Sequence, residues 1–114
     1  MRKIITYGGY FQKFMSTLDD QEVKKVDYVI SLLEREDRMP VKFVKFIRDG
    51  LYELRINTGN STYRVFFIFD EGNIGILFKG LKKKTQKTPN SELEKALRIK
   101  EAYYADKQSS NYRL

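Results

Sequence analysis

The sequence contains no cysteine and no histidine, and the two absences exclude several kinds of chemistry. No disulfide can form, and the usual ligands of structural zinc and haem are missing. Thiolate catalysis and every triad that uses an imidazole are excluded as well. No apolar run reaches the roughly 18 residues of a membrane-spanning helix, and residues 1–8 are too short and polar for a signal peptide. We therefore expect a cytoplasmic protein that uses no cofactor and no metal.

What the chain does contain is enough apolar material for one core. It has 114 residues, of which 41% are hydrophobic, with eight phenylalanines and eight tyrosines. A chain of this length has room for one domain, since domains most often have roughly 100 to 150 residues. We expect a single domain over residues 1–114, with a frayed tail at 107–114.

The basic excess of the sequence is concentrated in its middle. The chain carries 22 lysines and arginines against 15 acidic residues, a net charge of +7. Residues 41–88 hold ten basic and four acidic groups, a net charge of +6, whereas residues 1–40 are neutral. Such a concentration is typical of a surface that binds a polyanion. The alternative is an ordinary solvated surface, because a modest basic excess is common in proteins that bind no nucleic acid.

The spacing of apolar residues predicts three helices. Phe11, Phe14, Met15 and Leu18 form one stripe on a short helix that ends near Asp19. A second helix runs from Asp19 to Glu36, where an acidic residue three positions after the cap suggests a capping box. A last helix opens at Thr88-Pro89, with Thr88 as the N-cap candidate. Its expected inner face consists of Leu93, Ala96, Leu97 and Tyr104.

Alternating and β-branched segments predict the strands. An opening strand at residues 2–7 is stopped by two glycines, and strands at 51–57, 62–70 and 73–81 are separated by short turns. Short turns between neighbouring strands favour antiparallel pairing. The fold class is therefore α+β, with an opening strand, a two-helix hairpin, a three-stranded antiparallel meander and a C-terminal helix.

Arg64 is the first candidate functional residue, because it interrupts an otherwise apolar central strand. An arginine in that position needs a partner. One interpretation is an ion pair with Glu53 on the neighbouring strand. The other is a rigidly held guanidinium that grips a phosphate through two parallel hydrogen bonds, with Arg55 in the same site.

The densest basic stretch, residues 79–89, lies where the last strand leads into the last helix. Its lysines are candidates for a phosphate-binding rim, namely Lys79, Lys82, Lys83, Lys84 and Lys87. Tyr103 and Tyr104 are more typical of helix packing, although an aromatic side chain near a basic groove can stack on a nucleobase.

Several segments in this order resemble the RelE/ParE toxin superfamily, specifically the phage-derived HigB-like branch of type II toxin-antitoxin systems. They are Leu51-Tyr52-Glu53-Leu54-Arg55, Tyr63-Arg64-Val65, the run from Lys83 to Pro89, and a closing amphipathic helix with Ala96. The similarity extends from the opening strand to about Tyr104. It implies a RelE-like toxin that cleaves mRNA on the translating ribosome and is silenced by a cognate antitoxin, often a helix-turn-helix protein of the HigA type.

The resemblance also implies roles for individual residues. Arg64 matches the arginine that contacts the scissile phosphate, and Arg55 matches a basic residue on the preceding strand. Lys83 and Lys84 match paired lysines that contact RNA and the ribosome, so Lys84 joins the catalytic candidates. The sequence departs from the pattern at Lys79, where many relatives have histidine, at Leu81, where they have phenylalanine, and at Glu53, where some ribonucleases have a basic residue.

Without histidine, RNA cleavage has to depend on the substrate itself, with the ribose 2′-hydroxyl attacking the adjacent phosphate. Arg64, Arg55 and the lysines then stabilise the charge on the reacting phosphate, and either a desolvated lysine or Tyr103 accepts the proton. Two alternatives stay open. One is a ParE-like inhibitor of DNA gyrase on the same scaffold, and the other is a non-catalytic RNA-binding or antitoxin-sequestering relative.

Overall fold

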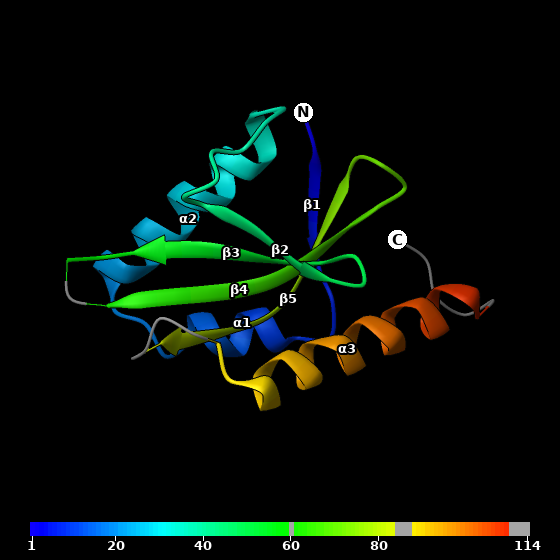
Figure 1. The fold of residues 1–114 in the computed structure, drawn as a ribbon. Coiled ribbons are helices and arrows are strands. Elements are labelled where there is room, and N and C mark those ends of the chain that lie inside the picture. The colour runs from blue at the N-terminus through cyan, green and yellow to red at the C-terminus, as the bar shows by residue number, and fades with distance from the viewer. Residues whose placement is uncertain (60, 84–87, 110–114) are drawn as a thin grey trace.

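The computed structural model describes residues 1–59, 61–83 and 88–109. Within these residues, five strands form one sheet in the order β1-β5-β4-β3-β2, with β1 parallel to β5 and the other neighbours antiparallel. Figure 1 shows α2 and α3 on opposite sides of this sheet. The elements are β1 (Lys3–Thr6), α1 (Tyr10–Met15), α2 (Asp20–Arg35), β2 (Val44–Arg48), β3 (Leu51–Asn57), β4 (Thr62–Asp70), β5 (Ile74–Lys83) and α3 (Asn90–Gln108).

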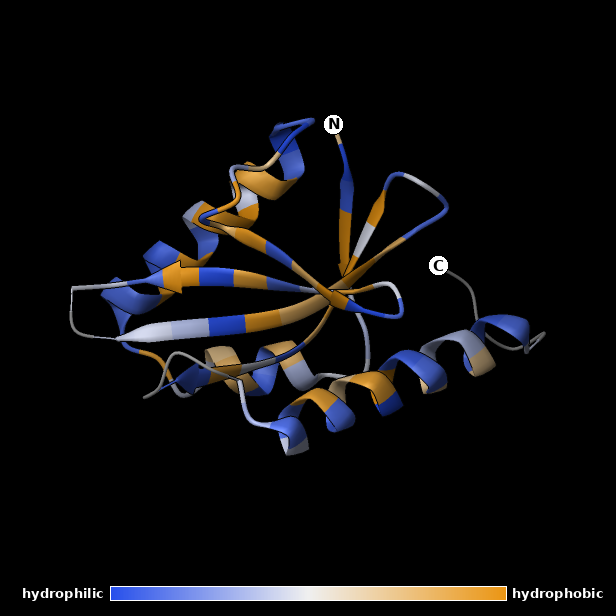
Figure 2. Ribbon diagram, viewed as in Figure 1, coloured by the Kyte–Doolittle hydropathy of each residue, from blue (hydrophilic) through white to orange (hydrophobic). Residues whose placement is uncertain are grey.

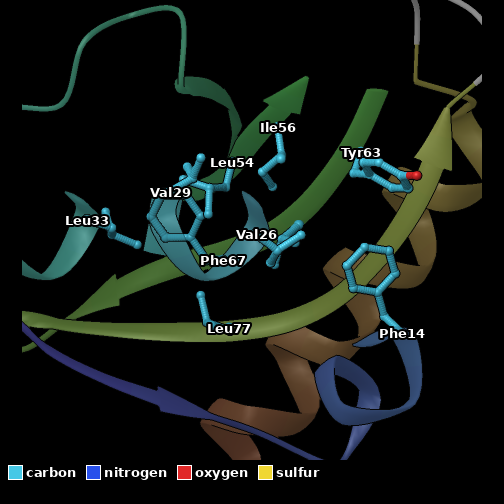
Figure 3. Packing of buried hydrophobic residues seen from close by; sticks show 10 residues of the cluster. Phe14, Val26, Val29, Leu33, Leu54, Ile56, Tyr63, Phe67 and Leu77 are labelled. Atoms are coloured by element: carbon cyan, nitrogen blue, oxygen red, sulfur yellow. The ribbon is translucent and has the colours of Figure 1, made fainter. Parts of the chain in front are cut away.

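Helices α1 and α2 cover one face of the sheet, which we call the α2 face. The expected capping box is present, because the Asp19 side chain accepts from the Glu22 amide and the Glu22 side chain accepts from the Asp19 amide. The buried side chains of α2 pack with Phe14 of α1 against the central strands, as Figure 3 shows. This core consists of Phe14, Val26, Val29, Leu33, Leu54, Ile56, Tyr63, Val65, Phe67 and Leu77.

Helix α3 covers part of the other face, which we call the α3 face. Side chains of a strand point alternately to the two faces of the sheet. The same strands therefore contribute one set of residues to the core under α2 and the intervening residues to a second core under α3. Its buried members are Leu51, Phe66, Ile68, Ile76, Phe78, Ala96, Ile99 and Tyr103. The expected inner face of the helix is confirmed in part, because Ala96 is buried and Leu93, Leu97 and Tyr104 pack against this core while only partly buried. Ile99 and Tyr103, which the pattern did not single out for this face, are buried as well.

The α+β fold class is confirmed, with one strand more than the sequence predicted. Strand β2 lies at the sheet edge and pairs antiparallel with β3, so the meander begins one strand earlier. Its residues are intermediate or exposed, and a strand without a buried face has a weak alternating pattern. Strand β5 also continues to Lys83, two residues further than expected, because Lys83 pairs with Thr62 at the start of β4.

The helix ends differ from the prediction as well. Helix α1 ends at Met15 rather than near Asp19. The N-cap of α3 is Pro89 and receives no side-chain cap, so the assignment of Thr88 as N-cap was wrong. Helix α3 extends to Gln108, so positions 107 and 108 of the expected frayed tail are helical, and residues 110–114 lie outside the described residues. Among the described residues, no helix is long and apolar enough to cross a membrane.

Gly80 allows α1 to pack directly on β5. A β-carbon at this position would lie 2.4 Å from the nearest atom of the Phe14 ring, which is closer than real side-chain contacts allow. The ring therefore lies on the bare backbone of β5, where a larger residue would push the helix away.

Candidate active site

The α3 face changes from apolar to charged along the length of its strands. On β4, Phe66 and Ile68 lie under α3, whereas Arg64, two residues earlier, belongs to a charged group beside the start of the helix. Figure 2 shows the change in β4, which is hydrophilic at its beginning and hydrophobic further along. We call this group the basic cluster. It consists of Lys45, Glu53, Arg55, Arg64, Lys83 and Thr88.

The strand register brings the two arginines together. Arg55 lies directly opposite Arg64, and Lys45 lies directly opposite Glu53. Like charges facing each other across a strand pair repel, so this arrangement requires a counter-charge. Glu53 supplies it, because its Oε1 lies 3.0 Å from Arg64 Nε and 3.5 Å from Arg55 Nε. The ion pair between Glu53 and Arg64 that the sequence suggested is therefore confirmed.

Thr88 completes the coordination of the Glu53 carboxylate. Its hydroxyl donates a hydrogen bond of 2.6 Å to the other carboxylate oxygen, Glu53 Oε2. Thr88 has this partner instead of capping α3, which explains the error in the cap assignment. Glu53 is only 1% exposed, so both its oxygens depend on these partners rather than on water.

The basic cluster holds more positive than negative charge. Within the described residues its four cations, Lys45, Arg55, Arg64 and Lys83, surround one carboxylate, which leaves a net charge of +3. Arg64 and Lys83 are each only 6% exposed. Burial of this kind disfavours positive charge, and a bound anion would relieve the imbalance.

Burial lowers the pKa of both buried cations. For Arg64, burial is the main cause, and the attraction of Glu53 opposes it. For Lys83, burial is again the main cause, and repulsion by Arg64 lowers the pKa further, against the attraction of Glu53. Lys83 is therefore a lysine whose ammonium group loses its proton more readily than usual.

The cluster opens into a small hollow of about 180 Å³. Its lining includes Lys45, Glu53, Arg55 and Lys83, with Phe46 on the edge strand. Charged groups thus meet at a concave surface that a phosphate group can enter. The Arg55 guanidinium lines this hollow, and guanidinium groups bind phosphate oxygens through paired hydrogen bonds, so the arrangement suits a phosphodiester.

The structure brings together only some of the residues that the sequence singled out. Arg55, Arg64 and Lys83 share the basic cluster. Lys79 instead forms an ion pair of 2.8 Å with Glu92 in the first turn of α3. Lys82 lies opposite Tyr63 and so on the α2 face. Lys84 and Lys87 lie outside the described residues.

Tyr103 is not close to the basic cluster. Its side chain is fully buried under the sheet, and its hydroxyl donates a hydrogen bond of 2.5 Å to Asp70 at the far end of β4. Asp70 is six residues from Arg64 along this strand, a separation of about 20 Å. The position of Tyr103 therefore gives no support to the prediction that it accepts the proton.

Two members of the cluster, Lys45 and Thr88, were missed from the sequence. Lys45 belongs to the edge strand that the pattern did not reveal. Thr88 was read as a local helix cap, whereas its partner Glu53 is 35 residues away in the chain. Residues 41–50 hold three basic groups against one acidic group, and this excess was a usable signal for Lys45. Nothing local in the sequence pointed to the hydrogen bond between Thr88 and Glu53.

We expect Asp70 to contribute to the stability of the protein at neutral pH and to lose this contribution in acid. Burial alone would raise its pKa, but hydrogen bonds from Lys107 and Tyr103 outweigh burial and lower it. A lowered pKa means that the stabilisation is complete above the unfolded pKa of about 3.9 and disappears as the pH falls through the folded value. Thermal melting between pH 7 and pH 2 should show a shallower acid loss for Asp70→Asn, with the exposed Asp27→Asn as control. Equal acid slopes for wild type and Asp70→Asn would contradict the prediction.

The fold and the cluster together define a class of protein: a small α+β protein whose sheet carries a cationic hollow of phosphate size beside its last helix. The family model "Phage derived protein Gp49-like (DUF891)" matches residues 13–101. The chain belongs to this family, a toxin family of the RelE/HigB type.

A solved structure shows the same fold. The archaeal RelE-RelB complex from Pyrococcus horikoshii OT3 contains a chain that is 17% identical and superposes with a TM-score of 0.54. The match covers 75% of this chain and 98% of that one. At this identity the likeness concerns the fold alone. No curated protein matches the sequence.

Proposed function

We propose that this protein is the toxin of a type II toxin-antitoxin pair and that its basic cluster cleaves mRNA on the translating ribosome. The observation that carries the proposal is the cross-strand pair of Arg55 and Arg64, held by Glu53 beside Lys83 in a cluster with a net charge of +3. Membership of a RelE/HigB-type toxin family supports the same interpretation.

The proposed reaction is a transfer within the RNA. The 2′-oxygen of one ribose attacks the adjacent phosphorus and loses its proton, while the bond from phosphorus to the 5′-oxygen of the next nucleotide breaks. The products are a 2′,3′-cyclic phosphate and a 5′-hydroxyl, whose proton comes from an acid or from water. Arg64 and Arg55 stabilise the negative charge that builds on the phosphate oxygens.

Lys83 is the proton acceptor in this proposal. Its pKa is lowered by burial and by the neighbouring arginines, so a neutral amine forms more readily than on an exposed lysine. We expect single-turnover cleavage to rise with pH until Lys83 is deprotonated. Lys83→Arg should remove this rise and slow cleavage by roughly 100-fold or more, the scale of general base catalysis. Lys24→Arg, an exposed position on α2, is the control. An unchanged pH profile in Lys83→Arg would assign the proton to another group.

The ribosome supplies the alignment of the substrate. The hollow of about 180 Å³ has room for a phosphate and little of its neighbouring nucleotides, so the protein alone fixes the RNA poorly, and positioning is worth several orders of magnitude in rate. The toxin is therefore nearly inert on free RNA. Its inhibitor is a cognate antitoxin, of helix-turn-helix type by the resemblance to HigB-like systems. The archaeal neighbour is itself a RelE-RelB complex.

Expression of the chain without its antitoxin tests the proposal. Pulse labelling should show protein synthesis falling before DNA synthesis, and mapping of transcript ends should show cuts within translated codons. Purified protein should cleave mRNA on programmed ribosomes and leave the same RNA intact in their absence. Early loss of DNA synthesis with gyrase-linked breaks would replace this function with gyrase inhibition. Arrest without cut transcripts or breaks would leave a non-catalytic RNA-binding role.

A further inference from the structure

A second and larger hollow lies at the other side of β5. It has a volume of about 520 Å³ and lies between α1 and the C-terminal half of β5. We call it the α1 pocket. Strand β1 pairs with β5 only as far as Leu77, so the later part of β5 is not covered by β1. Lys82 lines the α1 pocket while the next residue, Lys83, belongs to the basic cluster, because neighbouring strand residues point to opposite faces.

Tyr63 lines this pocket with a hydroxyl group that has no hydrogen-bond partner within the described residues. The side chain is fully buried. Figure 3 shows its hydroxyl pointing away from the apolar cluster around Val29 and Leu33, with the ring above Phe14. Burying a hydroxyl without a hydrogen-bond partner destabilises the folded protein, and phenylalanine would fill the same space without this cost. The hydroxyl therefore suggests a partner that is absent from the free protein.

The rest of the pocket describes that partner. Phe14, Leu18 and Leu81 form apolar walls, and Tyr10, with 43% of its surface exposed, provides an aromatic face. Lys13 and Lys82 add positive charge, and neither forms an ion pair within the part of the chain that the structure describes. Glu22 is the acidic lining residue, and one of its oxygens already accepts the Asp19 amide in the capping box of α2.

We propose that the α1 pocket binds one nucleoside monophosphate unit. Its base lies between the apolar walls with a polar edge on the Tyr63 hydroxyl, and its phosphate contacts Lys13 and Lys82. The volume lies within the range of small-ligand sites, and stacking on an aromatic side chain contributes to binding of any base. Lys82 lies directly opposite Tyr63 in the sheet, and in this proposal its flexible side chain moves aside when the ligand reaches the hydroxyl.

The unit has two possible sources. It is a free nucleotide, or it is one residue of an RNA strand that crosses the end of β5 with a phosphate in the basic cluster. The RNA source rests on the proposed function, whereas binding of a free nucleotide does not.

Titration of the protein with each of the four 5′-nucleoside monophosphates, followed by NMR, tests the pocket directly. We expect binding with shifts at Tyr10, Lys13 and Lys82, and a loss of roughly 10-fold in affinity for Tyr63→Phe, the scale of one hydrogen bond. Tyr63→Phe should melt at the same temperature as wild type or higher. The exposed Tyr28→Phe on α2 is the matched control and should bind normally.

A second titration separates the two sources. A short 2′-O-methyl RNA, which cannot be cleaved, is added to wild type and to Tyr63→Phe. Weaker binding of this RNA by Tyr63→Phe assigns the pocket to an RNA residue, and an effect confined to the mononucleotides assigns it to a free nucleotide. If Tyr63→Phe binds both the mononucleotides and the RNA like wild type, or if wild type binds neither, the inference is wrong. That result leaves the proposed function standing, because cleavage on ribosomes is measured separately.

Discussion

Arg64→Ala should slow mRNA cleavage on programmed ribosomes by roughly 100-fold or more, the usual effect of removing one electrostatic donor from a transition state. Stability should fall by only about 1 to 2 kcal/mol. The reason for this small loss is that Glu53 keeps Arg55 and the Thr88 hydroxyl as partners. Removing Arg64 also reduces the repulsion among the remaining cations of the cluster, which offsets part of the loss of stability. Cleavage assays and thermal melting of the same preparation measure the two effects.

Arg64→Lys adds a further test. Lysine keeps the charge but lacks the planar fork that binds two phosphate oxygens at once, so cleavage should stay badly impaired. Arg35→Ala, an exposed arginine on α2, serves as the control and should cleave at the wild-type rate. An Arg64→Ala protein that melts normally and still cleaves at a near wild-type rate would remove Arg64 from the active site.

Glu53→Ala should have the opposite profile, with its largest effect on stability. The substitution removes the carboxylate that pairs with Arg55 and Arg64 and attracts Lys83. Breaking a buried ion pair in this way costs about 3 to 5 kcal/mol, which lowers the Tm by more than about 10 °C for a domain of this size. Thermal melting at low ionic strength measures this loss of stability, and Glu94→Ala on the surface of α3 is the control.

Added anions should restore part of the lost stability. Sulfate stabilises folded proteins in general, but it also resembles the phosphate that the cluster is proposed to bind. At equal ionic strength, the gain in Tm from sulfate over chloride should therefore be larger for Glu53→Ala than for wild type. General screening of charge would make the two salts equivalent. A Glu53→Ala protein as stable as wild type in chloride would show that the cations do not need this carboxylate.

Features set by neighbouring residues could be predicted from the sequence. The capping box of Asp19 and Glu22 depends on groups three residues apart, and the sequence identified it correctly. The strand around Arg55 was found from its alternating side chains and the strand around Arg64 from its run of apolar residues. The ion pair of Arg64 with Glu53 was among the interpretations. Pairing across a short turn follows from local spacing, so the arginines were placed on neighbouring strands before their register was known.

Features that depend on distant contacts could not be predicted in this way. Strand β2 is recognisable only beside β3, because its own residues have no buried face. Thr88 has the sequence context of a helix cap, but its hydroxyl binds Glu53, which the fold brings to it from 35 residues away. The sequence made Tyr103 a candidate for the catalytic site, yet the packing of α3 directs it to Asp70.

The distribution of the lysines shows the same division. The sequence by itself determined that positive charge gathers between residues 41 and 88 and that Arg64 interrupts an apolar strand. Only the tertiary structure decided that Lys83 joins Arg64, that Lys79 pairs with Glu92, and that Lys82 lies in a different pocket. The physical reason is that composition and spacing act locally along the chain. The partners of a side chain depend instead on the sheet register and on which part of the sheet α3 packs against.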